Sequence, residues 1–149
     1  MLSTEPYPTS VTITDISLLS ITMESTQPEE QDTTYIAKAS VNLNDPQSKT
    51  ENDMTVLSAS VDVTVRATDD NTNEQVLSIN LEAGGTVIGD SSHSEEALWG
   101  LVVDAILGYI RTTIHTLTAE SVVKNGLYLP LTSGADLIHL VRETQSEKE

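Results

Sequence analysis

The side chains that could bind a transition metal are few in this sequence and lie far apart. The three histidines are His93, His115 and His139, and no two of them are three or four residues apart. One face of a helix therefore cannot present two imidazole ligands to a metal ion. The sequence predicts no metal site built on these residues.

A second segment has some of the oxygen ligands of a calcium loop. Asp69, Asn71 and Asn73 would occupy the first, third and fifth positions, but Glu74 stands where the loop needs glycine. The last position of such a loop also lacks its glutamate. Asp and Asn favour tight turns because their side chains accept hydrogen bonds from nearby backbone. The segment therefore predicts a hairpin turn rather than a calcium site.

The sequence also lacks the patterns that activate a nucleophile or hold a cofactor. It has no cysteine, no G-x-S-x-G elbow and no glycine loop followed by lysine. Gly84, Gly85 and Gly89 do not have the spacing of a dinucleotide-binding loop. We therefore expect no cofactor and rank an enzyme below a binding protein.

Size and charge restrict the class of partner. The chain has 149 residues and a formal net charge of −16, from 7 basic and 23 acidic residues. That length fits one domain, and because that charge repels phosphate backbones we expect no nucleic-acid partner. Residues Met1 to Tyr7 have no basic or apolar run typical of a secretory signal, and we expect no membrane span. These features predict a soluble, cytoplasmic protein.

The first half of the chain alternates apolar and polar residues as strands do. Four strands are predicted, and short polar connections between them favour an antiparallel sheet. The apolar parity changes within the first strand, which predicts a β-bulge near Asp15 to Leu18. We expect loops over Thr26–Thr34 and Asn44–Asp53. The predicted strands run through residues 11–23, 35–43, 57–67 and 76–83.

A long apolar helix follows the strands. Gly84 and Gly85 are expected to interrupt the fourth strand, and Ser92 or Ser94 to cap a helix from Leu98 to Leu117. This helix is apolar all round, so one side should pack on the sheet and the other on a second chain. The residues predicted at that oligomer interface are Trp99, Val103 and Leu107.

The C-terminal part predicts an apolar crossing loop and a short helix. The loop is predicted over Leu127 to Leu131. Ser133 is expected to cap a helix that contains Leu137, Ile138, Leu140 and Val141. The fold class is therefore α+β: a four-stranded antiparallel sheet, a long helix, a crossing loop and a short C-terminal helix. We expect a single domain over residues 1–149, with 1–8 and 144–149 flexible.

The order of these elements, together with several local segments, resembles the SecB export-chaperone family. Val61–Ala67 resembles the third strand of the family, Ala83–Gly89 the end of its fourth strand, and Leu107–Arg111 part of its long helix. Lys124–Leu131 followed by Ala135–Ile138 resembles its crossing loop and final helix. The resemblance covers about residues 10–142.

This resemblance implies a homotetramer, a dimer of dimers, that holds unfolded or nascent polypeptides in apolar grooves without ATP. The groove residues implied by position are Leu43, Met54, Val56, Leu127, Tyr128, Leu129 and Leu131. Export with the motor SecA would use an acidic sheet face, on which Glu24 matches one position while Ser20 and Asn80 replace acids. The chain also lacks the aromatic residues usual in the grooves, since it has no Phe, and the prolines usual within Ala105–Arg111.

Two alternatives to an export chaperone stay open. A divergent branch of the family protects the antitoxin of a toxin–antitoxin pair, so this chain could be a dedicated chaperone or binding protein for one such partner. A purely structural role is the other alternative.

Overall fold

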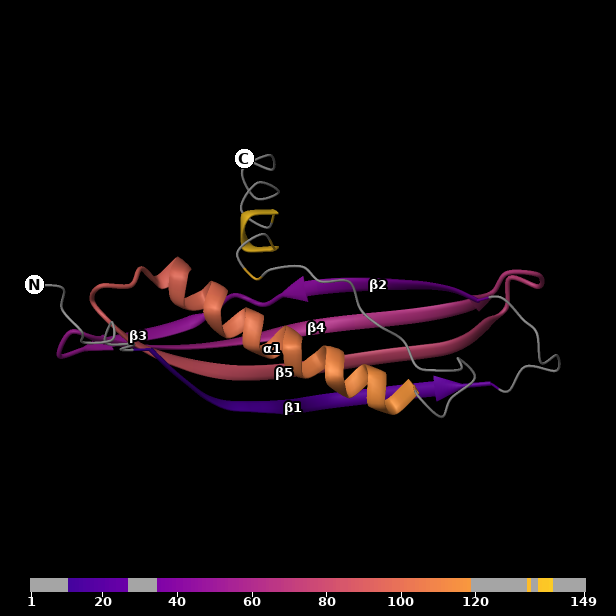
Figure 1. The fold of residues 1–149 in the computed structure, drawn as a ribbon, viewed down its shortest axis with the longest axis horizontal. Helices are drawn as coiled ribbons and strands as arrows, with labels where there is room; N and C mark the ends of the chain where they lie inside the picture. The colour runs from indigo at the N-terminus through magenta and orange to yellow at the C-terminus, as the bar shows by residue number, and fades with distance from the viewer. Residues whose placement is uncertain (1–10, 27–34, 119–133, 135–136, 141–149) are drawn as a thin grey trace, which may run out of the picture.

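The computed structural model describes residues 11–26, 35–118, 134 and 137–140. In these ranges an antiparallel sheet carries one long helix across a single face (Figure 1). The elements are β1 (Thr12–Ser25), β2 (Tyr35–Leu43), β3 (Gln47–Glu51), β4 (Met54–Asp69), β5 (Gln75–Asp90) and α1 (Glu95–Thr118). The sheet order is β1-β5-β4-β2, and β3 pairs with β4. The predicted α+β class is confirmed.

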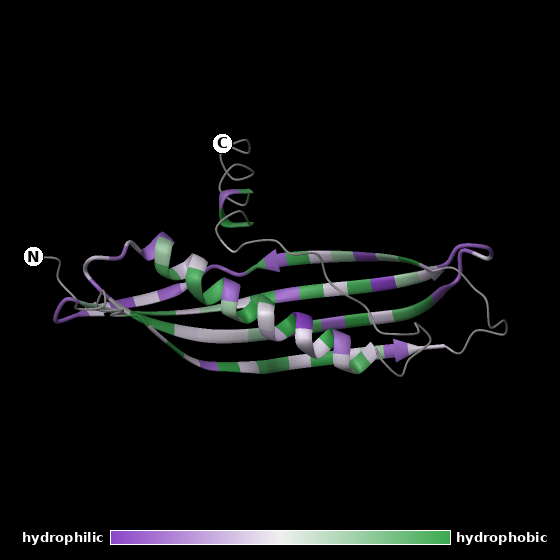
Figure 2. Cartoon of the chain, in the orientation of Figure 1, coloured by the Kyte–Doolittle hydropathy of each residue, from purple (hydrophilic) through white to green (hydrophobic). Residues whose placement is uncertain are grey.

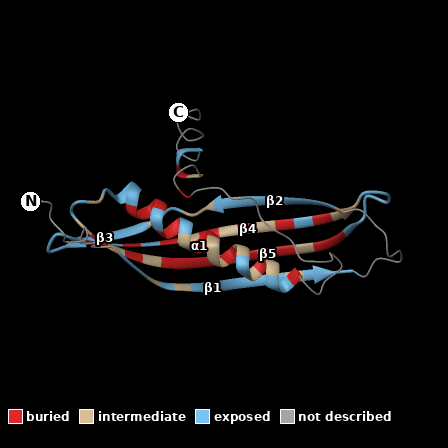
Figure 3. Ribbon diagram, viewed as in Figure 1, coloured by how far each residue is buried: buried red, intermediate tan, exposed pale blue. Residues whose placement is uncertain are grey.

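The two central strands, β4 and β5, carry most of the sheet's core side chains. Their residues alternate between buried and accessible because successive side chains of a strand point to opposite faces. The side that α1 covers is called here the helix side, and the opposite side the outer face. Figure 3 shows the burial concentrated on β4, β5 and α1, with β1 and β2 largely exposed. The buried helix-side residues of the sheet include Leu57, Val61, Val63, Val65, Leu77, Ile79, Leu81 and Val87.

The bulge predicted in β1 is present. The pairing of β1 with β5 shifts between Thr14 and Ser17 and again between Leu18 and Ser20, and Asp15 has a φ of 57°. Each shift adds a residue on β1 and changes which parity faces the helix side. Ile13, Leu18 and Ile21 all therefore pair with helix-side residues of β5.

The polar segment 44–53 is not a loop throughout, as the sequence had indicated. Residues 47–51 form β3, which pairs with residues 54–58 of β4. Asn52 and Asp53 connect the two strands with φ values of 51° and 61°. Two consecutive residues with positive φ form the turn that matches the twist of a hairpin, and Asn and Asp tolerate it better than most residues. Within the described ranges the sheet therefore has five strands instead of four.

The Asp69–Asn73 segment forms the predicted hairpin turn between β4 and β5. The backbone N–H of Asn71 donates to Asp69 Oδ1 at 2.8 Å, and that of Asn73 donates to the Asp69 carbonyl at 2.8 Å. The Asp69 carboxylate thus stabilises the turn itself.

Gly84 and Gly85 do not interrupt β5, which runs without a break from Gln75 to Asp90. They are instead places of close approach. A Cβ on Gly85 would collide with Ile16 Cδ1 and lie 3.3 Å from Val102 Cγ2. A Cβ on Gly89 would lie 2.5 Å from Leu98 Cδ2. Glycine at 85 and 89 therefore allows α1 to lie close against β5.

The helix α1 begins as the sequence predicts. Ser94 precedes its first residue and accepts a hydrogen bond at Oγ from the Ala97 N–H at 3.1 Å, while Glu95 and Glu96 stand in the positive first turn. The helix packs on β5, β4 and β1. By length and composition it could cross a membrane, contrary to the sequence-based expectation, but half of its apolar window is buried inside the protein. Such burial is typical of the core helix of a globular fold.

The far side of α1 is not the exposed surface that the sequence indicated. Trp99, Val103 and Leu107 are all buried within the single chain, at 4%, 0% and 6% exposure. The C-terminal segment contributes to this cover: the Gly134 N–H donates to Asp104 Oδ1, and Ile138 belongs to the same core cluster. The expectation that this side of α1 is exposed in a single chain is therefore wrong, whereas the place of these residues at an oligomer interface stays a prediction.

The end of the chain is described only in part. Residues 137–140 are helical, as predicted for the C-terminal helix. The predicted crossing-loop residues and the predicted flexible ends, 1–8 and 144–149, lie outside the described residues.

Candidate functional site

An apolar row runs along the helix side of β2, the strand at one edge of the sheet. Its residues pair with the buried row of β4, Ala39 with Val65 and Val41 with Val63. The β4 partners are fully buried, whereas Ala39 is exposed and Val41 is 37% exposed. The helix packs on β5, β4 and β1, so β2 projects beyond its cover. The row comprises Tyr35, Ala37, Ala39, Val41 and Leu43 and is called here the β2 strip.

The other edge strand, β1, also exposes apolar side chains. Ile13, Leu18 and Ile21 are 39%, 37% and 36% exposed on the helix side. Leu19, the extra residue of the second bulge, is 55% exposed and lies near Gly84. Figure 2 shows apolar positions recurring along both edge strands. Large exposed apolar surface on a small protein commonly marks a contact with another polypeptide.

The predicted groove residues that the structure describes do not lie together. Leu43 ends the β2 strip on the helix side and is half-buried against the core. Met54 and Val56 are 39% and 41% exposed but point to the outer face, because Leu57 and the odd-numbered residues after it point to the helix side. The other four predicted groove residues, 127, 128, 129 and 131, lie outside the described residues.

The outer face carries a pair of neighbouring carboxylates at the centre of the sheet. Asp62 and Glu82 are directly opposite each other in the register of β4 and β5. Asn44 Nδ2 donates to Asp62 Oδ2 at 3.1 Å and to Ser60 Oγ at 2.8 Å. The hydrogen bond with Asp62 and the negative charge of Asp62 both raise the pKa of Glu82. A proton shared by this pair would relieve their repulsion.

Glu24, the predicted acid of the SecA-docking face, is exposed on the outer face of β1, opposite Ser78. Asn80 binds Thr64, whose Oγ1 donates to Asn80 Oδ1 at 3.0 Å. Ser20 pairs with Glu82. The Asp62–Glu82 pair therefore supplies acidic charge beside Ser20, one of the two positions where an acid was expected. The alternation within each strand indicates that Asp62 and Glu82 both point outward, but it does not show that they are neighbours across the two strands.

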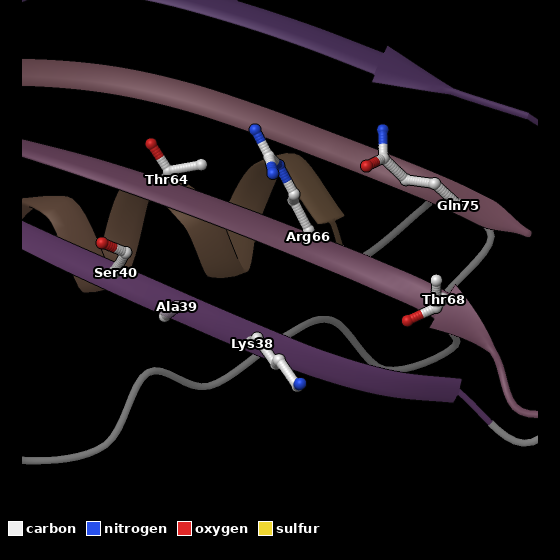
Figure 4. Close-up of a pocket in the computed structure, with 7 residues that line it drawn as sticks. All are labelled: Lys38, Ala39, Ser40, Thr64, Arg66, Thr68 and Gln75. Atoms are coloured by element: carbon white, nitrogen blue, oxygen red, sulfur yellow. The ribbon is translucent and has the colours of Figure 1, made fainter. Parts of the chain in front are cut away.

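A basic pair lies on the same outer face and was not recognised from the sequence. Lys38 on β2 is directly opposite Arg66 on β4, and both are exposed. Figure 4 shows the hollow that they line together with hydroxyl and amide side chains. Its remaining lining residues are Ala39, Ser40, Thr64, Thr68 and Gln75.

The turn between β5 and α1 brings a serine, a histidine and an aspartate together. Ser92 Oγ donates to Asp90 Oδ1, and His93 Nδ1 lies 3.1 Å from Ser92 Oγ and 3.2 Å from Asp90 Oδ1. A catalytic triad needs one ring nitrogen on the serine and the other on the carboxylate. Here Ser92 and Asp90 both contact Nδ1, so these three residues do not have the geometry of a triad. They form the turn that precedes α1. Among the described residues, no group of three or more histidine, cysteine, aspartate or glutamate side chains could hold a metal ion.

Comparison with known proteins relates this fold to a chaperone. No family model and no curated protein sequence matches the chain. Among solved structures it is similar to the Mycobacterium tuberculosis Rv1957 SecB-like chaperone, in complex with a ChAD peptide from the Rv1956 HigA1 antitoxin. The TM-score is 0.51 at 19% identity, and the match covers 83% of this chain and 91% of that one.

A protein of unknown function from Streptococcus agalactiae is similar to the same degree. Its TM-score is 0.51 at 10% identity, with 81% of this chain and 97% of that chain covered. These similarities show that the chain has a SecB-like fold, as its sequence predicted.

Proposed function

We propose that this protein is a SecB-like chaperone that holds unfolded or nascent polypeptides in the cytoplasm without ATP. It acts by binding and not by catalysis. The observation that carries the proposal is the β2 strip, an apolar row that continues the core beyond α1 and stays accessible. A surface of this kind accepts many sequences because apolar contact is not directional.

The open backbone edge of β2 adds to this surface. Among the described strands, β2 is last in the sheet order and pairs only with β4. An extended client could pair with its free N–H and C=O groups while alternate side chains contact the β2 strip. Backbone pairing supplies affinity without selecting a sequence, which suits a general holding chaperone.

Self-association is the second part of the proposal. The homotetramer implied by the SecB-like fold needs apolar surface outside the core of one chain. Because Trp99, Val103 and Leu107 are buried, the better candidates are exposed residues of β1 and the outer side of α1. Ile13, Leu18, Ile21 and Leu101 are each 36% to 39% exposed. Solution mass by light scattering tests this: a monomer at micromolar concentration would contradict it.

A dedicated chaperone for one partner is the second candidate. The specific observation in its favour is that the similar Mycobacterium tuberculosis chaperone was solved with an antitoxin peptide. Binding of one stoichiometric partner, without effect on generic unfolded proteins, would favour this candidate over a general chaperone. A toxin–antitoxin pair encoded beside this protein would point the same way.

The decisive experiment measures suppression of aggregation of an unfolded test protein. The double variant Ala39→Ser, Val41→Thr makes the β2 strip more polar while keeping side-chain size and strand propensity close to the original. We expect it to lose most of the holding activity. The matched control is Ile36→Thr, which changes an exposed apolar residue (46%) on the outer face of the same strand.

Thermal unfolding checks that all variants remain folded. Equal activity of the β2-strip variant and the wild-type protein would show that clients bind elsewhere. Lack of any holding activity in the wild-type protein would refute the general chaperone.

Coupling to export is a finer part of the first candidate. The outer face offers Glu24, Asp62 and Glu82 as acidic groups for SecA. A pull-down with purified SecA, repeated with Glu24→Gln, tests this partner. Binding that the variant leaves unchanged would mean that Glu24 is not part of the contact.

A further inference from the structure

The Lys38–Arg66 pair is an unusual placement of charge for this chain. The chain has 7 basic and 23 acidic residues, yet two of the basic ones stand directly opposite each other on neighbouring strands. Like charges directly opposite on a sheet are destabilising. Figure 4 shows the two charged ends directed apart, as repulsion requires.

Neither charge is neutralised within the described part of the chain. There the ion pairs are Lys49 with Glu51 and His93 with Asp90. Glu24 is in the same cross-strand row as Arg66, but Ser78 on β5 lies between them. Two strand spacings place it about 10 Å away, beyond ion-pair contact. The cationic pair is therefore open to a ligand of opposite charge.

The surroundings of the pair suit an oxygen anion. Ser40 contributes a hydroxyl and Gln75 an amide to the same hollow, and both residues are exposed. Thr64 and Thr68 already donate their hydroxyl protons, to Asn80 Oδ1 at 3.0 Å and to the Ile36 carbonyl at 3.3 Å. The remaining donors are thus an ammonium, a guanidinium, a hydroxyl and an amide. Charge-assisted hydrogen bonds from such groups favour a carboxylate.

We propose that the Lys38–Arg66 hollow binds a carboxylate side chain in an extended, acidic segment of another protein. The strand edge favours a peptide: an extended segment that pairs with the free edge of β2 places every second side chain on the outer face, beside Lys38. A polyanion such as nucleic acid is disfavoured because the net charge of −16 repels it along its whole length. A peptide with a few carboxylates feels that repulsion much less at physiological ionic strength.

This site does not depend on the proposed chaperone function. The β2 strip faces the helix side, whereas Lys38 and Arg66 face the outer side. The two surfaces share a strand edge and the small residue Ala39, but the charged side chains of Lys38 and Arg66 belong to the hollow alone. Loss of one activity would therefore leave the other measurable.

The test uses a fluorescein-labelled peptide of alternating threonine and glutamate, with a threonine–glutamine peptide as the neutral probe. Fluorescence anisotropy with the full chain should show the glutamate peptide bound at least about tenfold more tightly than the neutral one. The variants Lys38→Gln and Arg66→Gln should each weaken binding by about tenfold. The matched control is Lys49→Gln, which removes the same charge from an exposed residue paired with Glu51; we expect unchanged affinity.

Four results would overturn the proposal. Equal binding of the two peptides would show that no carboxylate is recognised, and an equal loss in Lys49→Gln would mean that only net charge matters. Inorganic phosphate that binds as tightly as the glutamate peptide would indicate a small-anion site. A single-stranded oligonucleotide that binds more tightly, and depends on Lys38 and Arg66, would indicate a nucleic-acid site.

Discussion

The contact between Gly89 and α1 gives a prediction whose sign can be worked out from distances. A Cβ on Gly89 would lie 2.5 Å from Leu98 Cδ2, 3.3 Å from Cδ1 and 3.4 Å from Cγ. Leu98 is fully buried in the first turn of α1, so the packed core has to absorb the shift of its Cδ2 methyl if Gly89 becomes alanine. We therefore expect Gly89→Ala to destabilise the protein by pushing α1 away from β5.

The magnitude follows from two opposing effects. Overpacking a core by a methyl group typically costs about 1–3 kcal/mol. Replacing glycine by alanine in a strand returns roughly 0.5–1 kcal/mol because the unfolded chain loses less freedom on folding. With each effect at the middle of its range, the net loss for Gly89→Ala is about 1 kcal/mol of unfolding free energy.

The matched control is Gly108→Ala, within α1. A Cβ on Gly108 would meet nothing within 4 Å. Only helix propensity then changes, so we expect a stabilisation of up to about 1 kcal/mol. Glycine to alanine should thus change the unfolding free energy in opposite directions at these two positions, because their surroundings differ.

Urea unfolding, followed by circular dichroism at one fixed protein concentration, measures both changes. With a slope of about 2 kcal/mol per molar urea, Gly89→Ala should lower the midpoint by roughly 0.5 M and Gly108→Ala should raise it by up to about 0.5 M. A Gly89→Ala variant as stable as the wild-type protein would refute the close packing of α1 on β5. Destabilisation by Gly108→Ala would refute the open surroundings of that residue.

Three further substitutions test electrostatics and capping. Lys38→Glu converts a repulsive cross-strand pair into an attractive one and should stabilise the fold by roughly 0.2–1 kcal/mol while abolishing binding of the glutamate peptide; a lower midpoint in urea would contradict it. The pKa of Glu82 is raised in the folded state, so the stability it contributes is present below its usual value of 4.5 and falls as pH rises through the raised pKa. Glu82→Gln should therefore raise the melting temperature at neutral pH, and this gain should disappear on acidification below pH 4.5; a gain that persists there would need another cause. Ser94→Ala removes the N-cap acceptor for Ala97 and should cost about 1 kcal/mol by urea unfolding, whereas Ser92→Ala, outside that contact, should cost less.

The sequence predicted best where one face of an element is buried. The alternation in residues 57–67 correctly identified the helix-side row of β4. A strand with one solvent-exposed face must alternate apolar and polar residues, because its side chains point to opposite faces in turn. The bulge in β1 was predictable for the same reason, because a change of apolar parity requires an extra residue. Capping chemistry offered Ser92 or Ser94 as the start of the helix, and Ser94 is the cap of α1.

The sequence failed where burial gives no pattern. β3 is exposed at every position, so it has no apolar alternation and reads as a polar loop. The available signal was the pair Asn52–Asp53, which suits a two-residue hairpin turn. Trp99, Val103 and Leu107 were assigned to a second chain because periodicity shows that a side chain is buried but not what buries it. The close approach of Gly134 to α1 depends on a contact between distant parts of the chain.

The candidate site was only partly predictable for a related reason. Odd or even position along a strand assigns a residue to one side of that strand. Met54 and Val56 are even-numbered and Leu57 is odd-numbered, so they point to opposite faces. Register between strands decides which side chains become neighbours, and no local pattern specifies it. Lys38 and Arg66 were each identifiable as outward-facing, but their pairing required the β2–β4 register.

The width of the sheet relative to its helix explains why one strand can carry two binding surfaces. A single helix covers about 10 Å, or roughly two strand spacings, so α1 can cover β4 and β5 but not both edges of a four-strand-wide layer. The helix side of β2 is therefore apolar but not covered by α1, and its outer face is exposed to solvent as well. Because successive residues alternate, Ala39 and Val41 serve the first surface while Lys38 and Ser40 serve the second. Apolar client contact and recognition of an acidic segment can therefore be changed separately by substitution, even though both use the same strand edge.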